Sequence, residues 1–151
     1  MSAERLLRLW LRVVAVILLP ALACALLPVA WMESVHEALG LGSWSGEPLL
    51  IYLARSVSVL YGFFGLTALF VSFDVRRYRP LVEFLALVGI AFGPCVLAIA
   101  ATAGMPPAWA WSEGPAVAGM CLVMFALARR AKEQEGREWP QESTKWHEKK
   151  H

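Results

Sequence analysis

Apolar residues in this chain are gathered into four long blocks, and nearly all charged residues lie in the short segments between and after these blocks. Blocks of this length are typical of α-helices that cross a bilayer, because about 20 apolar residues are needed to span its hydrocarbon core. The expected spans are residues 9–31, 48–73, 81–103 and 112–128. The pattern therefore predicts an all-α protein in which residues 1–130 form a transmembrane four-helix bundle.

The first outer loop, the start of the fourth span and the C-terminal segment each show a distinct sequence pattern. Between residues 31 and 39, apolar residues share one helical face and charged residues the neighbouring one, which predicts a short interfacial helix in the first outer loop. The start of the fourth span stays open between Pro107 and Ser112, because proline is favoured in the first turn of a helix. Residues 131–151 are almost wholly polar, so we expect a mobile cytoplasmic tail there.

Small residues recur at close to four-residue spacing in the second and third spans. The two stripes consist of Ala54, Ser58 and Gly62, and of Ala86, Gly89 and Gly93. Small side chains let two helix backbones approach each other closely in a bilayer. We therefore expect the second and third spans to pack against each other through these stripes.

The basic residues predict the orientation of the spans. Of the 14 Lys and Arg residues, all except Arg55 lie near the start of the first span, in the link between spans two and three, or after the fourth span. The positive-inside rule places these segments in the cytoplasm, so we expect a multi-pass protein with both termini cytoplasmic. An alternative is a signal peptide cleaved before Cys24, but the apolar run continues to Trp31, which favours a span.

Composition supports a membrane protein and excludes several other classes. Hydrophobic residues make up 58% of the 151 residues, which is more than a soluble domain needs for its core. The three cysteines, Cys24, Cys95 and Cys121, fall inside the expected spans and form no Cys-x-x-Cys pair, so we expect no disulfide framework. The basic residues of the tail alternate with Glu, a pattern that does not predict nucleic-acid binding.

Arg55 is embedded about 10 Å below the outer end of its expected helix. We place it in an outer polar layer together with Glu113, Glu33, His36, Glu37, Tyr52 and Trp109. Two interpretations stay open: the layer binds a lipid phosphate, a quinone oxygen or a carboxylate, or Arg55 neutralises outer carboxylates and holds the bundle together. We favour the second, because buried charges are usually paired, and we expect Arg55 to pair with Glu113.

Glu83 is a second embedded charge, close to the cytoplasmic end of its span. We expect it to belong to an inner layer of ion pairs with Arg12, Arg76 and Arg77. About 27 Å of helix separate Arg55 from this end of the bundle, so the outer and inner layers cannot meet.

No pattern for catalysis or metal binding is specific enough to name a reaction. Glu33-x-x-His36 has the spacing of one half of a di-iron site, but the chain has no second copy of it. His147 and His151 lie in the tail and cannot complete such a site. We therefore expect no metal site and no catalytic residue, and these residues favour a protein without catalysis. They do not indicate a cofactor.

Three stretches of the chain resemble a known group of membrane proteins. They are Tyr52-Leu-Ala-Arg-Ser-Val-Ser-Val-Leu-Tyr-Gly-Phe-Phe-Gly, Asp74-Val-Arg-Arg-Tyr-Arg-Pro and Gly104-Met-Pro. From about residue 6 to residue 128 the chain resembles uncharacterised bacterial four-helix integral membrane proteins, broadly the DoxX-like group. The resemblance implies a four-helix bundle of the bacterial inner membrane and assigns no activity, cofactor or site residue.

The sequence favours a small accessory protein over an enzyme. We expect a non-catalytic subunit that binds a lipid or another small molecule, in contact with the lipid bilayer. A further partner would be another membrane protein or a second copy of the chain. The alternative is a membrane redox enzyme or quinone-binding subunit that uses an outer-leaflet pocket around Arg55. The ligand, the partner protein and the oligomeric state stay open.

Overall fold

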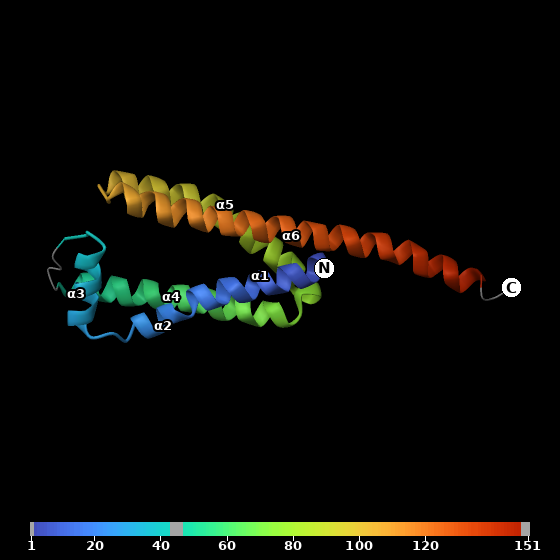
Figure 1. The fold of residues 1–151 in the computed structure, drawn as a ribbon, viewed down its shortest axis with the longest axis horizontal. Coiled ribbons are helices and arrows are strands. Elements are labelled where there is room, and N and C mark those ends of the chain that lie inside the picture. Colours follow the sequence, from blue (N-terminus) through green and yellow to red (C-terminus); the bar gives the residue numbers. More distant parts are fainter. Residues whose placement is uncertain (1, 43–46, 149–151) are drawn as a thin grey trace.

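The computed structural model describes residues 2–42 and 47–148, and all regular structure in these residues is α-helical (Figure 1). The helices are α1 (Ala3–Leu18), α2 (Pro20–Cys24), α3 (Val29–Ala38), α4 (Pro48–Phe73), α5 (Val75–Thr102) and α6 (Pro107–Glu148). The predicted all-α fold is confirmed, and so is the short helix, α3, between the first two spans.

Four helical segments are long and apolar enough to cross a membrane. They are Ala3–Cys24, which combines α1 and α2, then Pro48–Phe73, Val75–Thr102 and Pro107–Gly136. The shortest of them has 22 residues. At 1.5 Å per residue it is about 33 Å long, enough for a hydrocarbon core of about 30 Å. The chain is therefore a multi-pass membrane protein whose helices contact lipid.

Proline, glycine and capping residues decide where several helices begin and end. Pro48 and Pro107 open α4 and α6, where the N–H that proline lacks would have no partner within the helix. The side chain of Asp74 accepts a hydrogen bond from the backbone N–H of Arg77 at 3.2 Å and so caps the start of α5. Gly104 follows the end of α5 with a φ of 72°, a conformation that reverses the chain direction at little cost.

The first and third membrane segments differ in their bounds from the expected spans. The first membrane segment ends at Cys24, and Trp31 belongs to α3, because a turn interrupts the helix between them. α5 begins at Val75 rather than at residue 81, so Pro80 lies inside the helix and not at its start. The apolar block marks the part of the helix that fits the hydrocarbon core, whereas the cap at residue 74 sets the true start.

α6 is longer than its apolar block at both ends. It begins at Pro107, the earlier of the two starts left open by the sequence, and not at Ser112. Its helical backbone continues to Glu148, through the segment 131–148 that the sequence predicts to be a mobile polar tail. The first turns of this continuation contact α1 and α5 through polar side chains.

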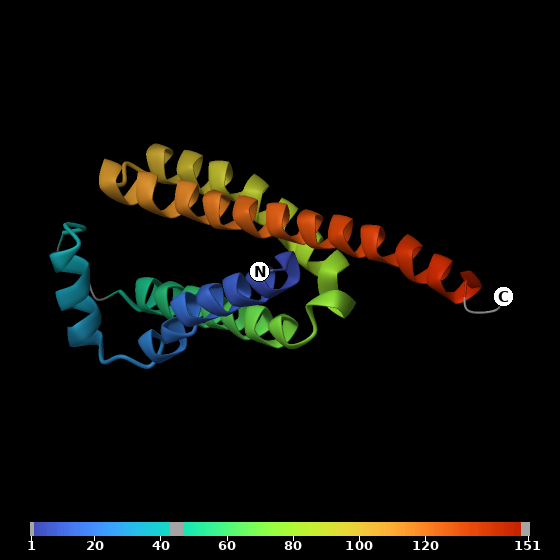
Figure 2. The same ribbon diagram turned by 45° about the vertical axis from the view of Figure 1, so that its right-hand side comes forward.

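The membrane helices pack as two pairs. α4 packs against α1 and α2, α5 packs against α6, and α1 also contacts α6. In Figures 1 and 2 the two pairs meet near the N-terminus of α1 and diverge toward the end that carries α3. α4 and α5 are consecutive in the chain but belong to different pairs.

The glycines of the two small-residue stripes lie within these pairs, so the expected packing of α4 on α5 through the stripes is wrong. A Cβ on Gly62 would meet the side chain of Leu22 in α2, and a Cβ on Gly93 would lie 2.6 Å from the Cβ of Ala118 in α6. Gly114 of α6 faces Gly93 in return, and a Cβ there would lie 2.5 Å from the carbonyl oxygen of Gly93. The stripes thus mark faces that pack closely, but they do not identify the partner helix.

The buried core lies where all four membrane segments meet. It consists of Leu7, Leu11, Val71, Val75, Val82 and Ala128. The adjoining segments 2–12, 74–83 and 129–136 contain nine of the Lys and Arg residues, and we call this end of the molecule the basic end. The core therefore holds the helices together at the same end at which their positive charges gather.

Candidate functional site

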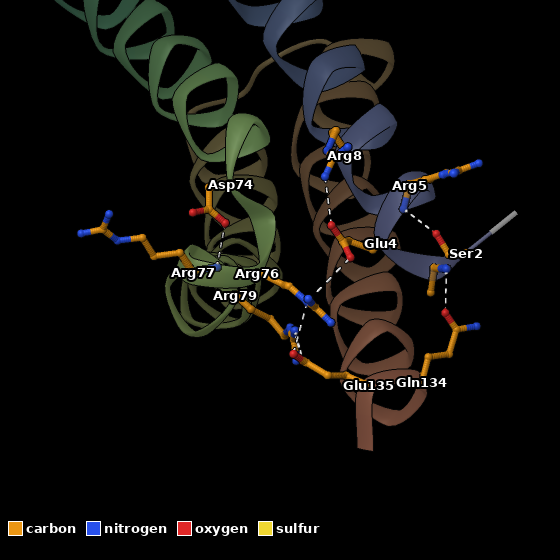
Figure 3. A network of polar contacts seen from close by, with 11 residues as sticks. Ser2, Glu4, Arg5, Arg8, Asp74, Arg76, Arg77, Arg79, Gln134 and Glu135 are labelled. Atoms are coloured by element: carbon orange, nitrogen blue, oxygen red, sulfur yellow. Dashed lines mark hydrogen bonds and ion pairs between the residues drawn. The ribbon is translucent and has the colours of Figure 1, made fainter. Parts of the chain in front are cut away.

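Ion pairs at the basic end join α5 to α6 and to α1 (Figure 3). Arg79 donates through Nη2 to Oε2 of Glu135, and Nε of Arg76 lies 3.3 Å from Oε1 of the same carboxylate. Arg76 also lies 4.0 Å from Glu4 of α1, whose other oxygen accepts a hydrogen bond from Arg8 at 2.9 Å. Glu135 therefore ties α6 to α5, and Arg76 links this pair of helices to α1.

The start of α1 is also held by α6. The backbone N–H of Ala3 donates to Oε1 of Gln134 at 2.8 Å, a hydrogen bond between residues 131 positions apart in the chain. The hydroxyl of Ser2 caps α1 by accepting from the backbone N–H of Arg5 at 3.4 Å. One turn of α6, with Gln134 and Glu135, thus contacts both α1 and α5 (Figure 3).

A pocket of about 290 Å³ lies beside this network, on α5 and α6. It is lined by Arg76, Arg79, Pro80, Glu83, Lys132 and Glu135. Residues three and four positions apart share one face of a helix, which explains why these residues come together. The volume is close to the lower limit of about 300 Å³ for small-molecule sites. Three basic side chains against two carboxylates leave the lining with a formal charge of +1.

Two buried polar atoms of the pocket residues have no hydrogen-bond partner. They are Nε of Arg79, which is a donor, and Oε1 of Glu83, which is an acceptor. The Arg79 side chain is only 12% exposed, although it carries a full charge. A buried polar group without a partner costs about 1–3 kcal/mol. A ligand that supplies partners to these atoms would therefore offset this cost.

The structure brings two of the four residues predicted for the inner layer to this pocket, Arg76 and Glu83. Arg77 points away from Glu135 (Figure 3). Its guanidinium lies 5.6 Å from the centre of the Tyr78 ring. Arg12 is exposed on α1. Within the described residues Glu83 forms no ion pair, so the inner layer is held by carboxylates other than the predicted one.

Sequence reasoning missed both carboxylates that hold the network. Glu4 stands four residues before Arg8 on α1, a spacing that is visible in the sequence and typical of helical ion pairs. Glu135 falls in the segment interpreted as a tail. Its available signal was the helical spacing that continues from Ala128 to Ala131, both of which are buried.

The contacts in the structure do not join the two charges of the predicted outer layer. Arg55 is exposed and donates through Nη2 to the backbone carbonyl oxygen of Leu27 at 3.2 Å. Glu113 accepts instead from the hydroxyl of Tyr61 at 2.7 Å and from the indole N–H of Trp109 at 3.0 Å. The expected pairing of Arg55 with Glu113 is therefore wrong.

Two hydrogen bonds connect the helix pairs away from the core. Tyr61 of α4 donates to Oε1 of Glu113 in α6, and Trp10 of α1 donates through its indole N–H to the backbone carbonyl of Met120 in α6 at 3.2 Å. Trp109, one turn before Glu113, donates to Oε2 of the same carboxylate. A carboxylate within a membrane segment is thus held by two neutral donors, one from each helix pair.

The remaining residues of the outer layer lie on α3 and near the start of α4. Glu33, His36 and Glu37 belong to α3, and Nδ1 of His36 lies 3.0 Å from the carbonyl oxygen of Gly42. Tyr52, near the start of α4, is exposed. In the part of the chain that the structure describes, no three His, Cys, Asp or Glu side chains are grouped so that they could hold a metal ion. The basic-end pocket, which is lined by charged side chains of α5 and α6, is the candidate site.

The comparisons with known proteins assign no function to the chain. No protein-family model, no curated protein and no solved structure matches the chain. The resemblance to the DoxX-like group is therefore not supported by a family match, whereas the architecture of four membrane segments stands on the structure itself.

Proposed function

We propose that the protein is a non-catalytic, lipid-binding protein of the bacterial inner membrane, and that an anionic phospholipid places its phosphate in the basic-end pocket. The observation that carries this proposal is the nearly buried guanidinium of Arg79, which lines the pocket with its Nε unpaired. A guanidinium is well suited to phosphate, because its N–H groups form charge-assisted hydrogen bonds with phosphate oxygens. Arg76 and Lys132 add positive charge to the same pocket.

The depth of the pocket supports a lipid as the ligand. A hydrocarbon core of about 30 Å accommodates about 20 helical residues. Counted from Thr102 at the end of α5 and from Pro107 at the start of α6, this length reaches about Val82 and Leu127. The pocket residues begin at this boundary and extend about 12 Å beyond it, which covers the layer occupied by phospholipid headgroups.

The distribution of charge supports the inner leaflet as the source of the lipid. The positive-inside rule assigns the basic end to the cytoplasm, which would place both termini and residues 131–151 there. The cytoplasmic leaflet carries anionic lipids, and basic pockets at membrane helices on that side hold their headgroups. A pocket with a formal charge of +1 at this depth fits such a lipid.

The rival function, a redox or quinone-binding subunit built around Arg55, has less support. The guanidinium of Arg55 is exposed and donates to the carbonyl of Leu27, so it stabilises the turn after α2. The resemblance to the DoxX-like group contributes no activity to either function. A partner membrane protein or a second copy of the chain is compatible with lipid binding.

Native mass spectrometry of the protein purified in mild detergent tests the proposal. We expect the wild type to retain an anionic phospholipid and to bind added phosphatidylglycerol. Lys132→Gln removes one pocket cation and leaves the contacts of Glu135 intact, so we expect the affinity to fall about tenfold, because a charge-assisted contact is lost. Arg79→Gln should lower the affinity further, with circular dichroism used to confirm that the variant is folded.

Arg130→Gln is the matched control. It removes one positive charge from an exposed position of α6 that does not line the pocket, so we expect the affinity to change less than twofold or so. Equal losses in Lys132→Gln and Arg130→Gln would show that the lipid responds only to surface charge. A wild type that binds no anionic phospholipid would contradict the proposed function.

A further inference from the structure

We infer that the lipid in the basic-end pocket carries a hydroxyl group close to its phosphodiester, as a glycerol headgroup does; this inference rests on the function proposed above. The two unpaired buried atoms of the pocket have opposite requirements. Nε of Arg79 needs an acceptor, and Oε1 of Glu83 needs a donor. A phosphodiester alone supplies only acceptors, so it would leave the Glu83 carboxylate unpaired beside a second anion.

The geometry of α5 places both groups within reach of one headgroup. Arg79 and Glu83 are four residues apart, so their side chains leave the same face of the helix with Cβ atoms about 5–6 Å apart. Arg79 donates through Nη2 to Glu135 across the helix pair, and no ion pair joins it to Glu83 among the described residues. When each side chain rotates to turn its buried atom toward the pocket, a phosphate oxygen at Arg79 and a hydroxyl a few bonds away on the same headgroup contact both side chains.

The charge of the pocket selects among headgroups that contain a donor. A phosphodiester with a hydroxyl group carries one negative charge, which neutralises the lining of +1. A phosphoethanolamine headgroup also has donors for Glu83, but it is zwitterionic, leaves the +1 uncompensated and brings an ammonium group close to Arg76 and Lys132. A phosphomonoester carries about −1.5 to −2 at neutral pH and overcompensates the lining. The pocket therefore fits a polyol phosphodiester best.

A matched pair of lipids tests this inference on the full-length protein. Phosphatidylglycerol and phosphatidylpropanol carry the same phosphodiester charge and differ in the hydroxyl groups of the headgroup. In native mass spectrometry titrations we expect phosphatidylglycerol to bind about tenfold more tightly, because one hydrogen bond to a carboxylate is gained. In Glu83→Leu the ratio of the two affinities should fall to about one, and in Glu83→Gln, which keeps a neutral acceptor, to about threefold.

The ratio isolates the hydroxyl contact, because the loss of the Glu83 charge affects both lipids equally. Glu37→Leu, which removes an exposed carboxylate from α3, should leave the ratio at the wild-type value. If a folded Glu83→Leu variant also keeps that value, Glu83 does not contact the hydroxyl and the inference is wrong.

The remaining outcomes separate this inference from the proposed function. Equal binding of the two lipids by the wild type would overturn the hydroxyl contact and leave anionic-lipid binding in place, whereas binding of neither lipid would overturn the proposed function itself. Phosphatidylethanolamine that binds more tightly than phosphatidylglycerol would show that Glu83 pairs with an ammonium group. Water-soluble glycerophosphoglycerol that binds as tightly as the lipid would overturn the membrane as the source of the ligand.

Discussion

Removal of the Tyr61 hydroxyl should weaken the contact between the two helix pairs, α1–α4 and α5–α6. In Tyr61→Phe the carboxylate of Glu113 loses a hydrogen bond of 2.7 Å and keeps the donor on Trp109. A hydrogen bond to a charged group contributes about 1.5–3 kcal/mol in soluble proteins, whereas polar contacts between membrane helices contribute about 0.6 kcal/mol on average and at most about 1.7. Because both partners are half-buried and one donor remains, we expect a loss of about 1 kcal/mol in the free energy of unfolding.

A double-mutant cycle measures this interaction directly. Reversible unfolding in mixed micelles, followed by far-ultraviolet circular dichroism, would be compared for Tyr61→Phe, Glu113→Leu and the double variant. We expect a coupling energy of about 1 kcal/mol between these two positions. The control cycle combines Arg55→Leu with Glu113→Leu, and because these side chains have different partners, their effects should add to within about 0.5 kcal/mol.

The opposite pair of results would refute this reasoning. Additive effects of Tyr61→Phe and Glu113→Leu, together with coupled effects of Arg55→Leu and Glu113→Leu, would show that the two embedded charges pair in the membrane. The hydrogen bonds from Tyr61 and Trp109 would then not account for the contribution of Glu113 to the stability of the protein.

Three further predictions concern packing, the extension of α6 and orientation. Gly93→Ala places a Cβ 2.6 Å from a backbone carbonyl oxygen of α6 and should lower the free energy of unfolding by about 1–3 kcal/mol. Gly119→Ala, with nothing within 4 Å, should not lower it, and equal losses would contradict the observed contact of α5 with α6. Deletion after Lys132 removes the carboxylate of Glu135 and should lower the unfolding midpoint, whereas deletion after Gly136 should leave the midpoint unchanged. Equal midpoints for the two truncated proteins would show that Glu135 does not contribute to stability. A topology reporter at the C-terminus should read cytoplasmic and one at Pro107 external, and the reverse at either position would exclude the proposed orientation.

The membrane segments could be predicted because a bilayer imposes a single requirement, a long apolar helix. α4 has the expected bounds, Pro48–Phe73, since a proline and the start of a charged link delimit both its apolar block and its helix. α5 begins six residues before its apolar block, at Val75 rather than at residue 81, because Asp74 caps the helix outside the hydrocarbon core. Apolar composition thus reports depth in the bilayer, and local hydrogen bonding reports where a helix starts.

The candidate site could be predicted only in part, because contacts between helices depend on direction as well as depth. Arg76 and Glu83 were found from the clustering of charge near one end of the spans. Glu135 was not predicted, because the polar composition of its segment does not indicate that the segment packs against Arg76 and Arg79 of α5. Arg55 and Glu113 match in estimated depth, but they belong to different helix pairs and turn to different partners.

The hydrogen bond from Ala3 to Gln134 has a consequence for the biosynthesis of the protein. It joins residues 131 positions apart, so it cannot form until Gln134 has been translated. At a synthesis rate of about 5–20 residues per second, Gln134 is added on the order of 10 s after the first turn of α1. Each helix pair can form as soon as its members are inserted, whereas the N-terminal turn gains this partner only after α6 has been synthesised. The basic end therefore cannot close before α6 has been synthesised, whatever the order in which the other contacts form.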